Sequence, residues 1–304
     1  MTRSTTDDLA VFESHRALLV AHAYRMLGDL GRAEDMVQDA WLRWDGRQEV
    51  EVDSPRAYLV TLVTRLCLNE LDSAKVRHEE SRSDRLPEPV DLDEGGIGRV
   101  ELLDQVSMAF LVVLQRLTPA ERAVLLLRDV FAFDYAEIAA LVGKTEAACR
   151  KLLERARQNV ATEKRMFSTS PEVHRRLLQA FTQAAAEGDI DALIAMLAED
   201  AVMITDGGPG GTRRGGVRNL PKPLHGSARI AAFVAATAGR SQLESEIHEL
   251  NGQPALVFYD EDVPFAALLL GVADARVHRV FFHADSARLR YLGRRNPKGS
   301  GRHL

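Results

Sequence analysis

Apolar residues recur at helical spacing through the first 80 residues. The segments FESHRALLVAHAYRML (12–27) and RAEDMVQDAWLRW (32–44) both carry them at intervals of three and four, and GDLG lies between the two. Ser54-Pro55 then supplies an N-cap followed by a first-turn proline for a third helix. The pattern predicts an all-helical domain over 8–80.

The next segment breaks this periodicity. Residues 81–99, SRSDRLPEPVDLDEGGIGR, contain two prolines, three glycines and an acidic cluster, which indicates a linker and not a core segment. Helical spacing returns over 100–166, where Thr118-Pro119-Ala120-Glu121 has the residues of a capping box. A second helical domain is therefore expected over 100–166.

Within this second domain, residues 133–157 read FDYAEIAALVGKTEAACRKLLERAR. Tyr135, Ile138, Ala139 and Val142 form one apolar stripe, and Gly143 suits a tight turn before a helix capped by Thr145. The polar side of that second helix is predicted to present Lys144, Thr145, Glu146, Arg150, Lys151 and Arg155. Such a face suits a DNA major groove, but an ordinary helical hairpin with a solvated basic face has the same spacing.

From Ser170-Pro171 onward the pattern changes. Two helical segments lead into a strand near 201–205, a glycine-rich loop and a helix near 227–239. Alternating segments follow, separated by Asn251-Gly252 and acidic turns, which are hairpin signals. An α+β domain with an antiparallel sheet is expected over 170–292, and the basic residues of 293–304 form a tail.

Composition limits the class of protein and its cellular location. The chain has 304 residues, a net charge of −5 and 46% hydrophobic residues, and it contains no apolar run long enough for a membrane span. A cytoplasmic location with no membrane contact is therefore expected. Its two cysteines, Cys67 and Cys149, lie among apolar neighbours, so buried thiols are predicted in place of a disulfide or a zinc site. No metal or other cofactor is expected.

Charge is unevenly distributed. Residues 1–165 contain 23 Lys and Arg and 29 Asp and Glu. Residues 144–165, by contrast, contain seven Lys and Arg and three Glu. A local basic stripe can approach phosphates even on an acidic domain.

Four motifs in this order resemble bacterial extracytoplasmic-function sigma factors. They are AYRMLGDLGRAEDMVQDAWLRW, SPRAYLVTLVTRLCLNELDSAK, the LTPAERAVLLLRD segment and the helix–turn–helix stretch that follows it. The resemblance implies two all-α domains, region 2 and region 4, which bind core RNA polymerase and promoter DNA and catalyse nothing.

The resemblance also implies roles for individual residues. Asp35, Gln38 and Asp39 match the helix that docks on the polymerase. Arg65, Asn69, Lys75 and Arg77 match the segment that reads the −10 element, with Trp44 or Tyr58 as a stacking platform or as core. The second helix of the helix–turn–helix matches the reader of the −35 element. Without the resemblance, Asp35, Gln38 and Asp39 would read as part of a solvated acidic face.

The C-terminal domain resembles the fused SnoaL-like extension of one sigma subgroup, which implies a cone-shaped α+β fold that tunes sigma activity. The residues that carry this likeness are Leu86, Pro87, Glu88 and Pro89 in the linker and Asp206, Gly207 and Gly208 in the loop. Two departures stand out: the subgroup's DGGGK is here DGGPGGTRRGG, and its terminal NPDKL has no clean match. HADSARL lies where NPDKL is expected, and NPKGS follows the last strand.

Other functions remain open for this domain. Asp206 with His225 or His248 could form an acid–base pair of an enzyme, and the pocket of such a fold could hold an unknown small-molecule ligand. The glycine-rich loop lacks GxxxxGK[ST], so a phosphate cradle is disfavoured.

A DNA-binding regulator that acts without polymerase is a further alternative for the whole chain, although the acidic balance of residues 1–165 argues against it.

Overall fold

The computed structural model describes residues 5–47, 52–76, 85–91, 107–163, 169–207, 220, 222–238 and 244–294. The chain divides into two compact units. One unit comprises 1–83, 100–103 and 111–162, and the other comprises 84–99, 104–110 and 163–304. The linker segment therefore groups with the C-terminal unit. Among the described helices, none is long and apolar enough to cross a membrane.

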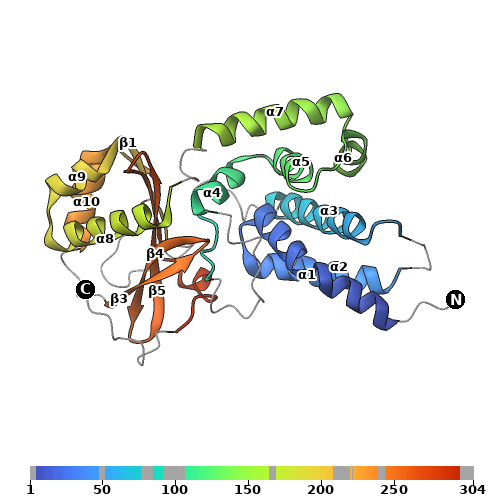
Figure 1. Ribbon diagram of the computed structural model, residues 1–304, viewed down its shortest axis with the longest axis horizontal. Coiled ribbons are helices and arrows are strands. Elements are labelled where there is room, and N and C mark those ends of the chain that lie inside the picture. The colour runs from blue at the N-terminus through green and yellow to red at the C-terminus, as the bar shows by residue number, and fades with distance from the viewer. Residues whose placement is uncertain are drawn as a thin grey trace. The chain divides into compact units, whose positions relative to one another are not determined.

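The N-terminal unit is helical, as the periodicity predicts (Figure 1). Its helices are α1 (Thr5–Leu27), α2 (Leu30–Asp45), α3 (Pro55–Val76), α4 (Met108–Arg116, whose first turn belongs to the other unit), α5 (Pro119–Asp129), α6 (Tyr135–Val142) and α7 (Glu146–Glu163).

Local sequence explains where several of these helices begin. Ser54 Oγ accepts a hydrogen bond from the Ala57 N–H at the start of α3, as expected. The predicted capping box of α5 is also present, since Thr118 and Glu121 satisfy each other's backbone N–H groups. α6 has a second capping box, from Asp134 and Glu137, that the sequence reading did not include.

Arg122 of α5 links α1 to α4 and α5 within this unit. Its side chain is buried, and its guanidinium donates to the carbonyl oxygens of Met26, Gln115 and Leu117. Met26 lies in the last turn of α1, where unpaired carbonyls and the helix dipole favour a cation. Next to it, Gly28 has φ +68°, and a Cβ there would lie 2.7 Å from Gln115 Nε2.

The C-terminal unit is α+β, as expected. Its elements are α8 (Pro171–Glu187), α9 (Ile190–Met196), β1 (Leu197–Asp206), β2 (Leu224–His225), α10 (Ser227–Ala238), β3 (Glu244–Leu250), β4 (Gln253–Asp260), β5 (Val263–Ala273), β6 (Arg276–His283) and a 3₁₀ turn, Ser286–Arg288. The six strands form one open sheet in the order β2-β1-β6-β5-β4-β3.

One strand pair differs from the expected antiparallel sheet. β1 and β6 are parallel, while every other described pair is antiparallel. The difference arises because β1 and β6 are joined through α10 and the four intervening strands, a connection long enough to return the chain in the same direction. β1 also begins at Leu197, before the predicted strand.

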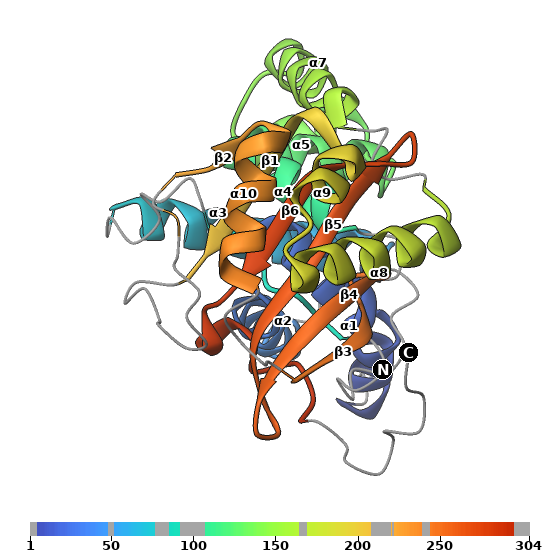
Figure 2. The same cartoon turned by 90° about the vertical axis from the view of Figure 1, so that its left-hand side faces the viewer.

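Helices α8, α9 and α10 cover one face of the sheet (Figures 1 and 2). Met203, Leu256, Leu268 and Phe282 pack against these helices in the core of the unit. Because strand side chains alternate between faces, neighbours such as His283 point to the opposite face. The sheet therefore offers two separate surfaces, one under the helices and one away from them.

Residues 86–91 of the predicted linker are packed in a core, contrary to the expectation that this segment stays outside one. Leu86 through Asp91 are buried, and Asp91 forms an antiparallel bridge with Leu250 at the end of β3. The two prolines that suggested a loop instead suit an extended segment that lies across a sheet and does not pair along a strand.

Candidate DNA-binding, polymerase-binding and linker-binding sites

The helix–turn–helix consists of α6 and α7 and the turn between them. Gly143 ends α6 with φ 64° and ψ 40°, a left-handed conformation that glycine adopts without strain. Thr145 caps α7, since its Oγ1 accepts from the Ala148 N–H at 3.2 Å. Both features agree with the sequence prediction.

α7 has the two faces that its sequence predicts. Cys149, Leu153 and Ala156 are buried, so the helix packs along this side. The opposite side is exposed and carries all six residues predicted to face DNA, which are Lys144, Thr145, Glu146, Arg150, Lys151 and Arg155.

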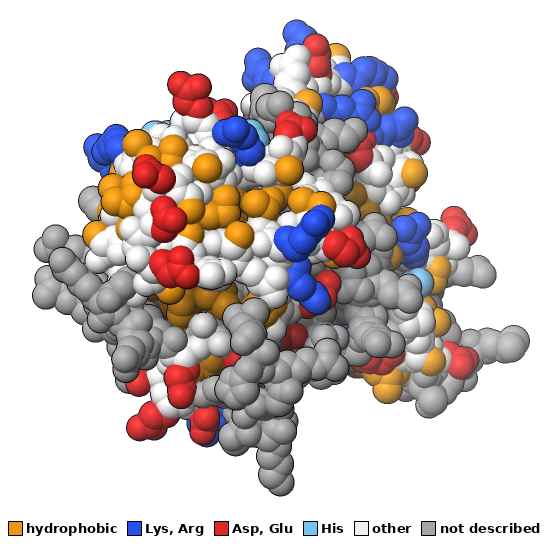
Figure 3. Space-filling view, turned by 60° about the vertical axis from the view of Figure 1, so that its left-hand side comes forward, with side chains coloured by type: hydrophobic (Ala, Val, Ile, Leu, Met, Phe, Trp, Pro, Cys, Tyr) orange, Lys and Arg blue, Asp and Glu red, His pale blue; other side chains and the backbone are white. Residues whose placement is uncertain are grey.

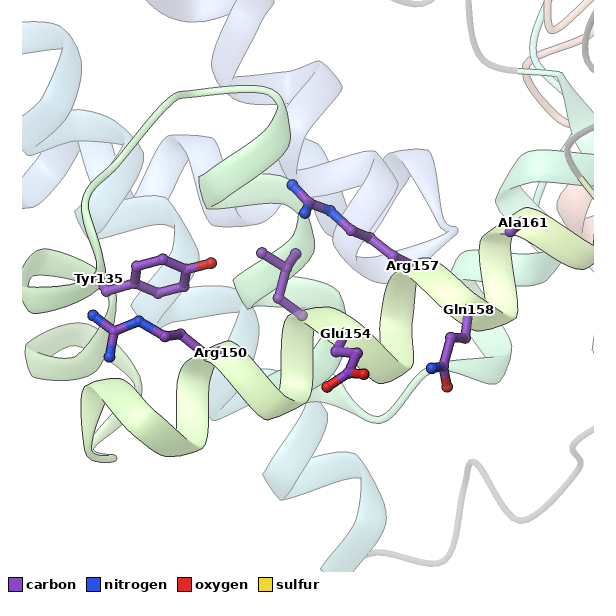
Figure 4. A pocket seen from close by; sticks show the side chains of 7 residues that line it. Tyr135, Arg150, Glu154, Arg157, Gln158 and Ala161 are labelled. Atoms are coloured by element: carbon purple, nitrogen blue, oxygen red, sulfur yellow. The ribbon is translucent and has the colours of Figure 1, made fainter.

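Arg150 is held in place on this face. Its Nη2 donates to Glu146 Oε2 at 2.8 Å, and its guanidinium carbon lies 4.7 Å from the centre of the Tyr135 ring. The stacked pair borders an open hollow of about 350 Å³ along α7 (Figure 4). Farther along the helix, Arg157 forms a two-point ion pair with Asp129, which raises the pKa of the guanidinium. Arg150 and Arg157 are thus oriented before any ligand binds.

In the first three helices the predicted site residues lie on exposed surfaces. α2 buries Leu30, Ala33, Val37, Ala40 and Trp44, which leaves Asp35, Gln38 and Asp39 on its exposed side. On α3, Arg65 and Asn69 are exposed one turn apart. The side chain of Lys75 and all of Arg77 lie outside the described residues.

Trp44 belongs to the core and is not a stacking platform. Its ring is fully buried, and Nε1 donates to the Asp8 carbonyl oxygen at 3.1 Å. Tyr58, whose ring centre lies 5.7 Å from that of Trp44, is 39% exposed. Of the two aromatic residues, only Tyr58 is accessible to a base.

The linker residues 85–91 bind the C-terminal sheet at both of their ends. At the first end, the Leu86 N–H donates to Asp206 Oδ2 at 3.0 Å. At the other end, Val90 and Asn251 exchange two hydrogen bonds, from the Val90 N–H to Asn251 Oδ1 at 3.1 Å and from the Asn251 N–H to the Val90 carbonyl at 3.0 Å. We call this set of contacts the linker clamp.

Strand spacing explains why the linker is extended. β1, which carries Asp206, and β3, which Asp91 bridges, are four strand spacings apart, or about 19 Å along the sheet. Five extended residues from Leu86 to Asp91 cover about 17 Å. The extended segment covers most of this distance on the face away from the helices, and the Asp206 side chain reaches out to the Leu86 N–H to complete it.

Charged side chains reinforce the first end of the clamp. Arg288, in the 3₁₀ turn after β6, lies 3.9 Å from both Glu88 Oε1 and Asp206 Oδ2. Glu88 and Asp206 are both buried, so the cation between them offsets the cost of removing two carboxylates from water. His283 lies in register with Asp206, and burial together with the charge of Arg288 lowers the pKa of its imidazole to about 3.

A second polar group holds the far end of the clamp. His248 Nδ1 lies 3.2 Å from Asp91 Oδ2, and His248 Nε2 lies 2.8 Å from the Tyr259 hydroxyl. After the linker, the Met108 N–H at the start of α4 donates to Gln253 Oε1 at 3.3 Å. The C-terminal sheet thus contacts the chain on both sides of the segment whose placement is not described.

The structure brings together part of the regulatory set expected from the sequence. Leu86, Glu88 and Asp206 meet in the clamp, Pro87 and Pro89 lie buried between its ends, and Gly207 follows Asp206 directly. Gly208 and the rest of the glycine-rich loop lie outside the described residues. Arg288 lies within HADSARL, the segment that stands where NPDKL was expected.

Sequence reasoning missed several residues of the clamp. Asn251 was read only as a hairpin turn residue, and its positive φ of 52° agrees with that role. Its side chain nevertheless binds the linker. Asp91, Gln253 and Arg288 gave no signal of their own, because their partners in the clamp are more than 80 positions away.

The alternative of an acid–base pair between Asp206 and His225 or His248 is not supported by the geometry. His248 is on β3, four strand spacings from the β1 strand of Asp206. His225 on β2 lies opposite Val202, four positions before Asp206. Asp206 instead accepts the Leu86 N–H and faces Arg288.

Comparison with known proteins identifies the family. Residues 11–77 match the family described as Sigma-70 region 2, and residues 107–160 match Sigma-70, region 4. The chain is 35% identical over 237 residues to the ECF RNA polymerase sigma factor SigJ of Mycobacterium tuberculosis, an alignment that covers 77% of this chain and 74% of SigJ. The chain is an alternative sigma factor of the extracytoplasmic-function family.

Two further similarities extend this result. The sigma factor is 37% identical over 191 residues to the probable ECF RNA polymerase sigma factor SigI of M. tuberculosis, covering 62% of this chain and 66% of SigI. The chain thus spans just under two thirds of that relative. The crystal structure of M. tuberculosis SigJ aligns with 93% of this chain and 98% of its own, with a TM-score of 0.69 and 28% identity. The fold similarity therefore includes the C-terminal α+β domain.

Proposed function

We propose that this sigma factor binds core RNA polymerase and directs it to promoters with separate −10 and −35 elements, and that its C-terminal domain restrains this activity by holding the linker. The observation that carries the regulatory part is the reciprocal pair of hydrogen bonds between Val90 and Asn251. The linker connects regions 2 and 4 in sequence, yet it groups with the C-terminal domain.

The exposed surfaces supply the two binding functions. Asp35, Gln38 and Asp39 on α2 form the polymerase-binding surface, and Arg65 and Asn69 on α3, with Lys75 and Arg77, contact the −10 element. The exposed face of α7 enters the major groove at the −35 element, where Arg and Lys contact guanine edges and phosphates.

The clamp suits regulation because its linker segment cannot occupy two surfaces at once. While Leu86 through Asp91 lie across the sheet, they are unable to reach polymerase or DNA. Several hydrogen bonds, each worth about 0.5–1.5 kcal/mol, hold the segment on the sheet. Their total free energy is small enough for polymerase binding to displace the segment.

The sigma factor is proposed to carry no catalytic site in its C-terminal domain. Asp206, which would have been the acid or base, is used by the clamp. His248, one of the two histidines considered as its partner, is used at the opposite end of the clamp.

Pull-down with core RNA polymerase followed by promoter mapping tests the proposal. The full chain and a truncation ending after residue 168 are both expected to bind polymerase and to initiate at the same promoters. The truncation should give the higher transcript output. Failure of both proteins to bind polymerase would refute the sigma activity. Equal outputs from the two would refute the regulation and leave the sigma activity intact.

A further inference from the structure

A cavity lies under the helices of the C-terminal domain. It encloses about 190 Å³ between α8, α10 and the helix-covered face of the sheet. Four phenylalanine rings line it, from Phe181, Phe233, Phe258 and Phe282, and Figure 3 shows hydrophobic side chains gathered on this domain. It is separate from the clamp, which lies on the other face of the same sheet.

The lining selects against charged molecules. None of the described residues that line the cavity carries a charge. An ion placed among phenylalanine and aliphatic side chains would lose its hydration without gaining a partner, at a cost of several kcal/mol. The ligand that fits this site is therefore neutral.

The two threonine hydroxyls in the cavity favour a ligand that donates a hydrogen bond, while the third lining hydroxyl, that of Ser245, lies at an exposed position of the edge strand. The Thr182 hydroxyl donates to the Leu178 and Gln179 carbonyls, and the Thr237 hydroxyl donates to the Phe233 and Val234 carbonyls. Since each hydroxyl proton is already used, the oxygen offers only lone pairs. A hydroxyl or N–H group on the ligand would find an acceptor at either threonine.

The volume limits the size of the ligand. Apolar protein cavities of about 150 Å³ bind benzene, so a cavity somewhat larger than this accepts one or two fused rings. Aromatic ligands gain additional stabilisation from edge-to-face contacts with phenylalanine rings.

We infer that this cavity is the binding site for a small, neutral aromatic molecule with one hydrogen-bond donor, and that its occupancy changes the linker clamp. The second part rests on the proposed function. Met203 lines the cavity and lies on β1 three residues before Asp206, and Phe282 lines it next to His283 on β6. A ligand that shifts these two strands relative to each other also moves the residues that hold the linker.

Binding is tested on the full chain with three probes of similar size. These are 2-naphthol, naphthalene and the anion 2-naphthoate, and binding is followed by thermal shift and by ligand-observed NMR. We expect 2-naphthol to bind most tightly and to raise the Tm. Naphthalene should bind more weakly, and 2-naphthoate should bind at least tenfold more weakly than 2-naphthol. Equal binding of the anion, or no binding of either neutral probe, would overturn the site.

Two variants locate the binding. Ser245 is exposed on the edge strand β3 and lines the cavity, so Ser245→Trp should close it without affecting the core and should weaken 2-naphthol binding at least tenfold. Glu249→Trp, on the same face of β3 but away from the cavity, is the matched control and should bind normally. Thr237→Met fills the cavity from α10 and should give the same loss as Ser245→Trp. Undiminished binding by both cavity variants would refute this location.

Hydrogen exchange at residues 86–91 in the same titration tests the coupling. Saturation with 2-naphthol should change the exchange rate of the Leu86 and Val90 amides severalfold. Binding without such a change would refute the coupling. If these amides exchange as fast as an unfolded peptide before any probe is added, the clamp itself, and with it the proposed regulation, is wrong even though the ligand site stands.

Discussion

The Leu86 N–H donates to Asp206 Oδ2 across 120 positions of sequence, at 3.0 Å. The bond joins the linker that follows region 2 to the end of a strand in the C-terminal domain. Together with the Asn251 contacts it converts a segment that reads as a loop into part of a folded unit.

Loss of the clamp is expected to raise promoter output. In Asn251→Gly the left-handed turn is retained, because glycine accepts positive φ, but the side-chain bond to the Val90 N–H is lost. Asp206→Ala removes the acceptor of the Leu86 N–H and leaves Glu88 to pair with Arg288 alone. Transcription with core polymerase should increase severalfold for both variants.

Glu249→Gln, which changes an exposed β3 residue near Asn251, serves as the control and should transcribe like the unmodified chain. Output from both clamp variants equal to that of the control would contradict the regulatory role of the clamp.

Substitutions on α7 are expected to affect the −35 element and not polymerase binding. Arg150→Ala removes a guanidinium positioned by Glu146 and Tyr135, and should weaken binding to a specific promoter by about 1–3 kcal/mol, or roughly 5–150-fold. Lys151→Ala, if Lys151 contacts phosphate, should lower affinity for all sequences and reduce the salt slope by about one. Promoter binding by the polymerase holoenzyme at several salt concentrations distinguishes the two effects.

Arg116→Ala, which removes an exposed arginine of α4 outside the helix–turn–helix, is the matched control. A loss of polymerase binding in Arg150→Ala would show that this face docks on protein and not on DNA.

Arg122 is expected to stabilise the N-terminal unit. Arg122→Met would leave the buried carbonyls of Met26, Gln115 and Leu117 without this donor, and should lower the free energy of unfolding by about 3 kcal/mol. Arg122→Lys should recover little, because an ammonium lacks the planar fork of donors. Urea unfolding followed by tryptophan fluorescence reports on this unit, since both tryptophans, Trp41 and Trp44, lie in α2.

Arg116→Met, at an exposed position of α4, is the control and should change stability by less than about 0.5 kcal/mol. If the two methionine variants unfold at the same urea concentration, the Arg122 contacts do not stabilise the unit.

Acid is expected to destabilise the protein through buried histidines. Burial lowers the pKa of His22 and His283 to about 3, with help from Arg25 and Arg288, and that of His174 to about 4. In the unfolded chain each has a pKa near 6.5, so between pH 6.5 and these lowered values the unfolded state binds more protons. The free energy of unfolding should therefore fall with decreasing pH, by up to about 1.4 kcal/mol per pH unit for each histidine.

Chemical denaturation of the full chain at pH 7, 6 and 5 measures this effect. His283→Gln should flatten the pH dependence, whereas His225→Gln, at an exposed position on β2, should not. If His283→Gln leaves the slope of unfolding free energy against pH unchanged, the imidazole of His283 is hydrated or already protonated in the folded protein.

Local signals in the sequence were enough to place the helices and the exposed face of α7. Thr118 with Glu121, Gly143 and Thr145 each act on neighbours within four positions, so their structural roles follow from spacing alone. The burial of Cys149 and Leu153 opposite Arg150 and Lys151 follows from the same helical period.

The clamp was predictable only in part. The LPEP and DGG motifs pointed to a contact through the family resemblance, but composition pointed to a free linker. Prolines and acidic residues are typical of solvated loops, and nothing near Glu88 or Asp91 shows that Arg288 and His248 will lie beside them. The parallel pairing of β1 with β6 was missed for the same reason, since register between distant strands has no local signature.

The sequence by itself determined the helical domains, the exposed basic face of α7 and the α+β character of the C-terminal domain, because periodicity and capping are properties of neighbouring residues. Only the tertiary structure decided that the linker lies across the sheet, that Asp206 serves the clamp and not a catalytic pair, and that four phenylalanines enclose a cavity. These depend on which residues of distant strands share a face, and that is fixed only when the sheet forms.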